Sequence, residues 1–260
     1  MSTHQGLADD LALAHELADA ARKLSLSYFR RQPKQYSKPD GSIVTEADQA
    51  VEDELRRMLA AVRPGDAILG EERGATGNAP RRWIIDPIDG TNDYARGGTQ
   101  WWSLIALEID GRIAVGVCEQ PAVRRRCWAT RGGGAFNLVE GSEPTPLHVT
   151  RTSNLKSARV FVAPPEWLRD DSARRRAAAL AAASQREPHV DHPALQVAAG
   201  GYEAAVFFVA GPWDLAAPSI VVEEAGGKFT DTAGRYDIAG NGAVFSNGLV
   251  HDAVVALVAP

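Results

Sequence analysis

The amino-acid sequence predicts a mixed α and β fold made of two subdomains, residues 1–147 and 148–260. In the first half, two helical patterns precede several short apolar strands joined by tight turns, which is typical of an antiparallel sheet. From about residue 148 onward, short apolar strands alternate with helical segments. A chain of 260 residues can bury a large core, either as one domain or as two closely packed halves.

Two amphipathic helices open the chain. In the first, apolar residues recur every three or four positions between Leu7 and Tyr28. The second follows Thr45, whose side chain suits an N-cap because it can accept hydrogen bonds from the first free amides of the helix. Asp48 falls in the first turn, where a carboxylate interacts favourably with those amides. This helix is expected to end at residues 63–65, which contain Pro and Gly.

Short apolar strands follow these helices. They are expected at residues 67–69, 83–85, 104–109, 113–118 and 126–129, with a loop over residues 74–80 and a glycine run at 132–134. Cys118 and Cys127 fall on neighbouring strands of this set. We expect two buried, reduced thiols, because disulfides are rare in cytosolic proteins, and a disulfide between them is the alternative.

The second half is predicted to alternate between strands and helices. Strands are expected at residues 160–162 and 204–209, and helices at residues 172–184, 195–199 and 217–225. Two consecutive glycines follow the last of these helices, and glycine is a common residue just beyond a helix end.

Composition excludes some classes of function. The net charge of -5 argues against a nucleic-acid binder, which usually carries a basic surface on a basic domain. No segment reaches the roughly 18 consecutive apolar residues expected of a membrane span. The first residues lack the basic start and apolar run of a secretory signal. We therefore expect a cytoplasmic protein that binds neither nucleic acid nor membrane.

The sequence Asp-Pro-Ile-Asp-Gly-Thr, which begins at Asp86, carries two carboxylates directly after an apolar strand. Proline lacks a backbone N–H and fixes a bend, so the Ile88 carbonyl can point the same way as Asp86 and Asp89. Gly90 and Thr91 would then open a helix, whose free amides bind phosphate well. Oxygen ligands beside an anion-binding helix end are what a magnesium phosphatase needs.

For an isolated pair of acids at this spacing, a strand-end acid and a helix cap are the favoured interpretation, because helix caps are so common. Three further segments favour the metal site. Glu71 and Glu72 are adjacent acids that follow another predicted strand, and Thr45 and Asp48 offer a hydroxyl and a carboxylate at a helix start. Asp214 begins an otherwise apolar helix, where an unpaired charge is costly.

Together these motifs resemble the inositol monophosphatase family of metal-dependent phosphatases. The sequences Gly-Glu-Glu, Asp-Pro-Ile-Asp-Gly-Thr and Trp-Asp-Leu-Ala-Ala occur in the family's order and spacing. Lys38 and residues 42–48 complete its N-terminal signature, and the likeness extends to residues 246–248. The resemblance implies a layered α-β-α-β-α sandwich of the inositol monophosphatase / fructose bisphosphatase type, and a homodimer.

The resemblance also implies which groups hold metal. Two Mg²⁺ ions, and a more weakly held third, would be bound by oxygens of Glu71, Asp86, Ile88 (carbonyl), Asp89, Thr91 and Asp214. Asp86 would bridge the first two ions, and Glu71 would help through the third. Lithium would inhibit by occupying the second position.

For catalysis, the resemblance implies that a hydrogen-bonded pair, Thr91 and Asp48, deprotonates the attacking water. The amides of Gly90 and Thr91 would bind the phosphate. The wider set of substrate-binding residues would be Asp89, Asp214, Lys38 and Asp191. Because no Cys or Ser nucleophile is required, we expect direct attack by water without a phosphoenzyme.

Several segments resemble the histidinol-phosphate phosphatases of this family. They are residues 96–97, Trp101 and residues 105–111, 125–129 and 131–136. The expected activity is therefore hydrolysis of histidinol phosphate, a step in histidine biosynthesis. The alternative is an inositol-1-monophosphatase or a related sugar-phosphate phosphatase, and a more remote one is a family member that binds phosphorylated ligands without turnover.

The chain departs from the family pattern on the substrate side. Residues 188–193 replace a segment that usually begins with Gly and a polar residue, and Phe207 stands where a Glu is common. His189, Asp191 and His192 could form an altered substrate pocket, and a polar surface loop is the alternative.

Three other residues have two interpretations each. Glu203 could supply a replacement carboxylate, but we expect a solvent-facing acid at a helix end. Trp101 and Trp102 could both line the pocket, but we expect at least one to be packed in the core, where tryptophan is common.

Overall fold

The computed structural model describes residues 3–29, 31, 33–38, 41–168, 170–188, 191–240 and 242–260. Its largest sheet has eight strands, in the order β10-β9-β8-β7-β6-β5-β3-β4. They are β3 (Ala67–Gly70), β4 (Gly74–Thr76), β5 (Arg81–Asp89), β6 (Trp102–Ile109), β7 (Arg112–Gln120), β8 (Arg125–Thr130), β9 (Gly134–Val139) and β10 (Thr145–Pro146). Neighbouring strands are antiparallel except for β3 and β5.

A second sheet has five strands in the order β12-β11-β13-β15-β14. They are β11 (Arg159–Val162), β12 (Gln185–Glu187), β13 (Ala204–Phe207), β14 (Lys228–Thr230) and β15 (Ala243–Ser246). β11 runs parallel to both of its neighbours, whereas β15 is antiparallel to β13 and β14. A separate hairpin pairs β1 (Gln35–Ser37) with β2 (Ile43–Thr45).

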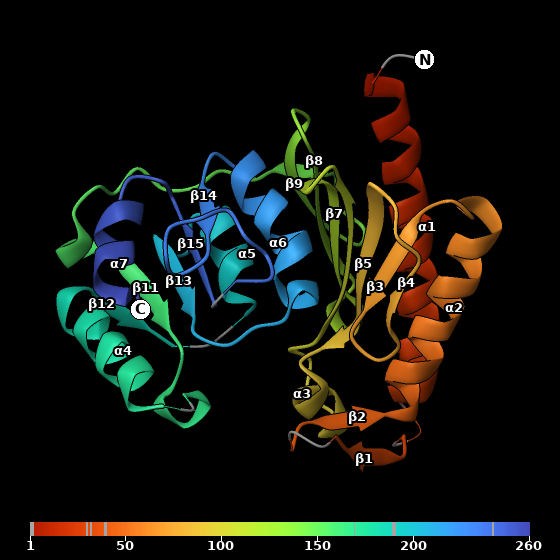
Figure 1. Cartoon of the computed structure of the whole chain (residues 1–260), viewed down its shortest axis with the longest axis horizontal. Helices are drawn as coiled ribbons and strands as arrows, with labels where there is room; N and C mark the ends of the chain where they lie inside the picture. The colour runs from red at the N-terminus through yellow and green to blue at the C-terminus, as the bar shows by residue number, and fades with distance from the viewer. Residues whose placement is uncertain are drawn as a thin grey trace.

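Helices form the remaining layers (Figure 1). They are α1 (Thr3–Phe29), α2 (Glu46–Val62), α3 (Thr91–Ala95), α4 (Asp171–Ala183), α5 (Pro193–Ala198), α6 (Pro212–Glu224) and α7 (His251–Val258). α1 and α2 cover the outer face of the large sheet, α5 and α6 lie between the sheets, and α4 and α7 cover the outer face of the small sheet. The predicted α-β-α-β-α layering is confirmed, while the subdomain boundary at residue 147 stays a prediction.

The α6 helix is the central packing element. Its residues 215–222 are all buried, and they belong mostly to one core cluster that also includes Leu104 from β6 and Phe245 from β15. A helix that is apolar on every side must be covered on every side. The apolar sequence of α6 is therefore consistent with its place between the two sheets.

Most predicted elements are confirmed, and four differ notably in extent. The strand expected at residues 204–209 ends at Phe207, so Val209 lies in the loop that follows. The expected loop over residues 74–80 is wrong at its start, because residues 74–76 pair with β3 as strand β4. The strand expected at residues 83–85 extends over Arg81–Asp89, so the acidic motif lies within β5. The helix expected at residues 217–225 begins at Pro212, which places Asp214 in its first turn.

Two other expectations concern the cysteines and membrane spans. Cys118 and Cys127 lie directly opposite one another on β7 and β8, and both are buried free thiols, as predicted. Within the described part of the chain, no helix combines the length and the apolar character that crossing a bilayer would require.

Candidate metal centre and active site

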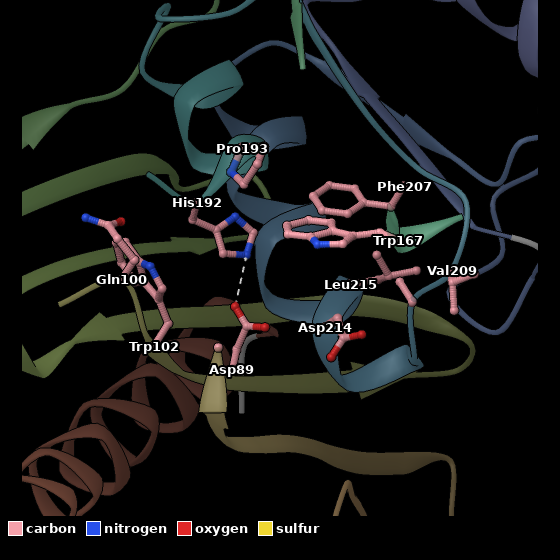
Figure 2. Close-up of a pocket in the computed structure, with 12 residues that line it drawn as sticks. Asp89, Gln100, Trp102, Trp167, His192, Pro193, Phe207, Val209, Asp214 and Leu215 are labelled. Carbon is pink, nitrogen blue, oxygen red and sulfur yellow. Dashed lines mark ion pairs between the residues drawn. The ribbon is translucent and has the colours of Figure 1, made fainter. Parts of the chain in front are cut away.

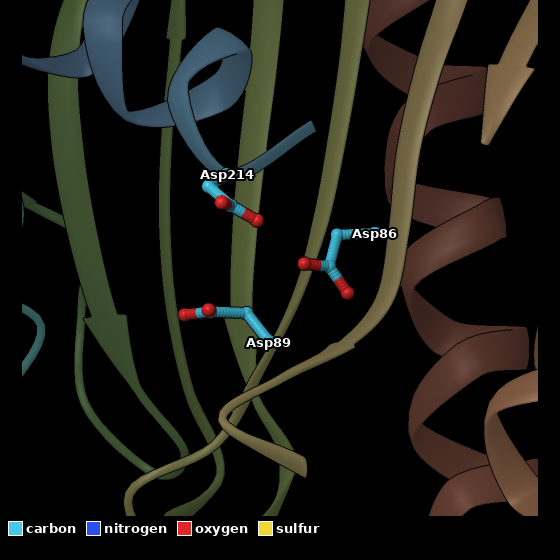
Figure 3. Close-up of side chains that lie close together, drawn as sticks. All are labelled: Asp86, Asp89 and Asp214. Carbon is cyan, nitrogen blue, oxygen red and sulfur yellow. The ribbon is translucent and has the colours of Figure 1, made fainter. Parts of the chain in front are cut away.

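Three carboxylates converge where the large sheet meets the first turn of α6. Asp86 and Asp89 come from β5, and Asp214 comes from α6 (Figure 3). One oxygen of each lies within 4.8 Å of one oxygen of each of the others. The fold thus brings Asp214 next to Asp86 and Asp89, which precede it by more than 120 residues along the chain.

An irregularity in β5 brings Asp86 and Asp89 to the same side of the strand. Residues three apart on a regular strand point to opposite faces. Here the register against β6 shifts between Asp86 and Asp89, so that one extra residue separates them, as in a β-bulge. The Ser103 hydroxyl donates to the Pro87 carbonyl at 2.6 Å and fixes this bend.

Local hydrogen bonds fix Asp214. Pro212 occupies the first turn of α6, where its missing N–H costs nothing. The Gly211 amide donates to Asp214 Oδ2 at 2.7 Å, which fixes the carboxylate at the helix start. An acid in this position is also favoured by the positive end of the helix dipole.

Burial and repulsion by neighbouring carboxylates disfavour the charged form of all three acids. Burial, followed by the charges of Glu71, Asp89 and Asp214, raises the pKa of Asp86 well above its usual range. Enclosure in the site raises the pKa of Asp89 to about 8 and that of Asp214 to about 6. Asp86 Oδ1 is buried and receives no hydrogen bond from the residues that the structure describes.

A divalent cation fits this donor set. The available groups are all oxygens, the ligands that Mg²⁺ prefers, and clustered buried carboxylates are costly without a compensating charge. Asp86 Oδ1, which has no hydrogen-bond partner among the described residues, is available as a further ligand atom.

Glu71 lies beside this cluster, and its charge contributes to the raised pKa of all three acids. Its carboxylate accepts a hydrogen bond from Lys38 Nζ at 2.8 Å, and the same ammonium donates to Glu72 at 2.7 Å. Burial raises the pKa of Glu72 to about 7. The structure therefore places Lys38 and Glu71 together at the edge of the acidic cluster.

Thr91 and Asp48 form the hydrogen-bonded pair that the sequence predicts. Thr91 Oγ1 lies 3.1 Å from Asp48 Oδ1 and 2.9 Å from the Ile88 carbonyl oxygen. Asp48 is fully buried, and Thr45 donates to its Oδ2 through both the backbone N–H (2.8 Å) and the hydroxyl (2.5 Å). Burial raises the pKa of the Asp48 carboxyl.

Gly90 is required where β5 turns into α3. Its φ is +84°, a conformation that costs little only for glycine. A Cβ at this position would lie 2.6 Å from the Gln100 carbonyl oxygen. The turn thus starts α3 directly after Asp89, with the amides of Gly90 and Thr91 at its N-terminus.

A cavity of ≈ 230 Å³ adjoins Asp89 and Asp214 (Figure 2). Its other lining residues are Gly90, Gln100, Trp102, Trp167, His192, Pro193, Phe207, Val209, Ala210 and Leu215. Trp102 lines it, whereas Trp101 is fully buried against Phe29 and Tyr94. The expectation that at least one of the two tryptophans is packed in the core is confirmed.

The altered segment near residue 190 contributes His192 to this cavity. His192 Nε2 lies 3.7 Å from Asp89 Oδ2, and the imidazole meets the Trp102 ring edge-on. Asp191 lies behind it, with Oδ2 accepting hydrogen bonds from Arg125 (2.5 Å) and Gln196 (2.7 Å). Asp191 is absent from the cavity lining, and its Oδ1 accepts a hydrogen bond from the His192 backbone N–H at 2.8 Å, while His189 lies outside the described residues.

The expectation for Glu203 is wrong. Glu203 is only 1% exposed, and it directly precedes β13 instead of ending a helix. Its carboxylate accepts hydrogen bonds from the Arg159 backbone N–H and side chain, which explains why the charge can be buried. Among the cavity residues that the sequence did not single out, Trp167 stands in a short segment that has no periodic signal, whereas Val209 was expected at the end of a strand.

The inositol monophosphatase family model matches residues 7–259 of this chain. This chain belongs to the inositol monophosphatase family. Members of this family are metal-dependent hydrolases of phosphoric monoesters, and the acidic cluster described above is present here.

Individual proteins agree with this family assignment. The chain is 42% identical to histidinol-phosphatase of Mycobacterium tuberculosis, over 95% of this chain and 96% of the relative. It is 38% identical to histidinol-phosphatase of Streptomyces coelicolor, over 94% of each. The solved structure of the extragenic suppressor protein suhB of Bartonella henselae has the same fold, with a TM-score of 0.85 at 22% identity, covering 96% of this chain and 98% of that one.

Proposed function

We propose that this chain is a magnesium-dependent phosphatase that hydrolyses histidinol phosphate by direct attack of water. The convergence of three carboxylates, Asp86, Asp89 and Asp214, carries the metal-dependent part of this proposal. The two relatives that share the name histidinol-phosphatase, at 38–42% identity over nearly their whole length, support the substrate.

The proposed metal ligands are oxygens from three segments of the chain. They are the side chains of Glu71, Asp86, Asp89, Thr91 and Asp214, and the Ile88 carbonyl. Asp86 is the central member, because it is 1% exposed and has an oxygen without a hydrogen-bond donor among the described residues. Two or three bound Mg²⁺ ions would neutralise phosphate charge and lower the pKa of water.

Thr91 and Asp48 are proposed as the base. The attacking water gives its proton to Thr91 Oγ1 while the Thr91 hydroxyl proton moves to Asp48 Oδ1, 3.1 Å away. Burial favours the protonated form of Asp48, which suits a group that must accept this proton. As the water oxygen bonds to phosphorus, the ester P–O bond breaks, and the leaving alkoxide takes a proton from solvent and departs as the alcohol. Asp48 returns its proton to solvent when inorganic phosphate is released.

The phosphate is proposed to lie at the start of α3, where the amides of Gly90 and Thr91 donate to it. Asp89 and Asp214 border the same cavity and orient the substrate. Lys38 supplies a cation at the edge of the site, paired with Glu71 and Glu72. Asp191 contributes by fixing the segment that carries His192.

The test is release of inorganic phosphate with and without Mg²⁺ from four esters. These are histidinol phosphate, inositol 1-phosphate, a sugar phosphate and 3′-phosphoadenosine 5′-phosphate. We expect the highest kcat/KM for histidinol phosphate and no turnover in EDTA. A preference for inositol 1-phosphate would favour the inositol-1-monophosphatase alternative, and no turnover of any ester would favour a family member that only binds its ligand.

Three further properties belong to this proposal. We expect a homodimer, measured by light scattering, and a cytoplasmic location, where a biosynthetic enzyme meets its substrate. We also expect lithium to inhibit at fixed Mg²⁺, and rates that do not change over a lithium titration would contradict the assignment of the second metal position.

A further inference from the structure

The cavity beside the acidic cluster has an apolar wall that the chemistry at phosphorus does not use. Trp167 ends the short helix η3 (Pro165–Trp167), Phe207 ends β13, and Val209 lies in the loop that follows. Figure 2 shows the rings of Trp167 and Phe207 next to one another on one side of the cavity. The imidazole of His192 lies across from them, and Asp89 and Asp214 lie below.

A buried aromatic cluster supports this wall. The Phe207 ring packs against Phe161 and Phe245, with centroid distances of 5.7 and 5.9 Å. Trp167 packs against the same Phe161 ring at 6.3 Å. Because Phe161 is only 1% exposed, both cavity rings rest on a fixed side chain. A wall held in place before binding loses little conformational entropy when a ligand arrives.

The chemistry of the wall indicates what it can bind. Trp167 is 48% exposed and Val209 is 54% exposed, so a large apolar surface faces the cavity and its mouth. The hydroxyls of a polyol would lose hydrogen bonds to water against such a surface. A flat ring would instead pack against the aromatic side chains, and a positively charged ring would gain a cation–π attraction. The cavity lining contains no Lys or Arg among the described residues that would repel such a cation.

We propose that Trp167 and Phe207 bind the ring of the substrate and thereby determine specificity. The site selects phosphate monoesters whose alcohol carries a flat, weakly basic aromatic ring, such as imidazole. This inference rests on the proposed function for the reaction at phosphorus. Asp89 and Asp214 line the same cavity, so one small molecule reaches both the acids and the aromatic wall.

The test compares two esters that differ in the ring. Alaninol phosphate keeps the amino-alcohol phosphate of histidinol phosphate but has a methyl group in place of the imidazolylmethyl group. W167A and F207L should each lower kcat/KM for histidinol phosphate about tenfold, the size of an aromatic contact. Both variants should leave kcat/KM for alaninol phosphate within about twofold of the wild-type value.

F208L is the matched control. Phe208 follows Phe207 but packs with the cluster around α4, with its ring 5.3 Å from the Arg176 guanidinium, and it does not line the cavity. F208L should change neither substrate's kcat/KM. Thermal melting of all three variants verifies that they fold.

The outcomes separate this inference from the proposed function. If W167A and F207L lowered kcat/KM equally for both esters, or kept the wild-type ratio of the two kcat/KM values, the ring-binding role would be overturned. The proposed function would still stand. If the wild type does not hydrolyse histidinol phosphate, 4-nitrophenyl phosphate and glycerol 2-phosphate become the test pair. A ring preference that W167A and F207L abolish would then support the inference, and the absence of any ring preference would overturn it.

Discussion

At the scale of single residues, Asp89 shows how strongly its surroundings disfavour a negative charge in the acidic cluster. Its pKa is raised to about 8 by enclosure and by the charges of Asp214 and Glu71. We expect D89N to lower phosphate release at least about 100-fold, because a ligand charge is lost, and each factor of ten corresponds to about 1.4 kcal/mol. Without metal, D89N should melt at the same temperature as the wild type or higher, because the neutral amide avoids the cost of holding a carboxyl with a raised pKa in the folded state.

The control for D89N is D252N, which makes the same change at a side chain that is 93% exposed. D252N should keep wild-type phosphate release. Wild-type turnover in D89N would contradict the two-metal assignment. A large drop in the melting temperature of metal-free D89N would show instead that Asp89 is needed for folding.

His251 gives a prediction about pH and stability. It is 1% exposed and bonded through its two ring nitrogens to Thr230 (3.0 Å) and Ser246 (2.8 Å). Burial, followed by the charge of Lys228, lowers the pKa of His251 from 6.5 to about 4. The unfolded chain therefore takes up the proton first, so stability should fall as the pH drops from about 6.5 to about 4, by up to about 3 kcal/mol.

Urea unfolding at a series of pH values measures this effect. H251Q should show a smaller loss of stability over that pH range than the wild type, since the group that protonates on unfolding is gone. H148Q, at an exposed histidine, is the control and should follow the wild-type curve. If the free energy of unfolding of H251Q fell with pH as steeply as that of the wild type, His251 would not be the source of the pH dependence.

At the scale of elements, the contact between β7 and α6 positions Asp214. A Cβ on Gly116 of β7 would lie 2.5 Å from Ile220 Cγ2 and 2.8 Å from the Ala217 carbonyl oxygen. The backbone oxygen cannot move unless α6 moves, and Asp214 is one turn before Ala217. We expect G116A to destabilise the protein by about 1–3 kcal/mol and to raise the Mg²⁺ concentration needed for half-maximal activity.

G65A is the matched control, because a Cβ on Gly65 would meet nothing within 4 Å. Melting temperature and Mg²⁺ dependence of phosphate release should be unchanged in G65A. If G116A kept the wild-type melting temperature and Mg²⁺ dependence, the close contact between β7 and α6 would not be needed to position Asp214.

How well each element could be predicted depends on the length of its pattern. α1 and α2 were predicted because an apolar stripe recurs over many turns. The short strands β12 (Gln-Arg-Glu) and β14 (Lys-Phe-Thr) were missed, because they lack the apolar run by which β3, β11 and β13 were predicted, and β9 and β15 were missed as well. β4 forms because Gly74–Thr76 pairs with β3, a tertiary contact that local sequence does not specify.

The same contrast holds for the site. Acids in short motifs after strands predicted the cluster of Asp86, Asp89 and Asp214, because buried charges are unusual in any sequence. Phe207 was placed on the substrate side only through the family resemblance, and Trp167 could not be placed there at all, because apolar side chains are common and their partners come from distant segments. Glu203 was misplaced because Arg159, the partner that makes its burial possible, is 44 residues away.

At the scale of the whole molecule, the acidic cluster joins the large sheet to the helix layer between the sheets. Asp86 and Asp89 belong to β5, and Asp214 belongs to α6, whose core is shared with the small sheet. An ion held by all three acids binds only when these layers are packed together. Mg²⁺ should therefore stabilise the native state, by about 2.7 kcal/mol at a concentration of 100 times its Kd.

For a chain of this size, that stabilisation corresponds to a rise in Tm of roughly 5–10 °C. The measurement is thermal melting over a Mg²⁺ titration, with KCl at matched ionic strength as the control and EDTA to reverse the shift. D214N should lose most of the Mg²⁺-induced rise in Tm, because α6 then no longer supplies a carboxylate to the ion while both acids of β5 remain. An equal shift in D214N would mean that the ion is held by β5 and its neighbours alone, and no shift in the wild type would argue against a metal centre that joins the layers.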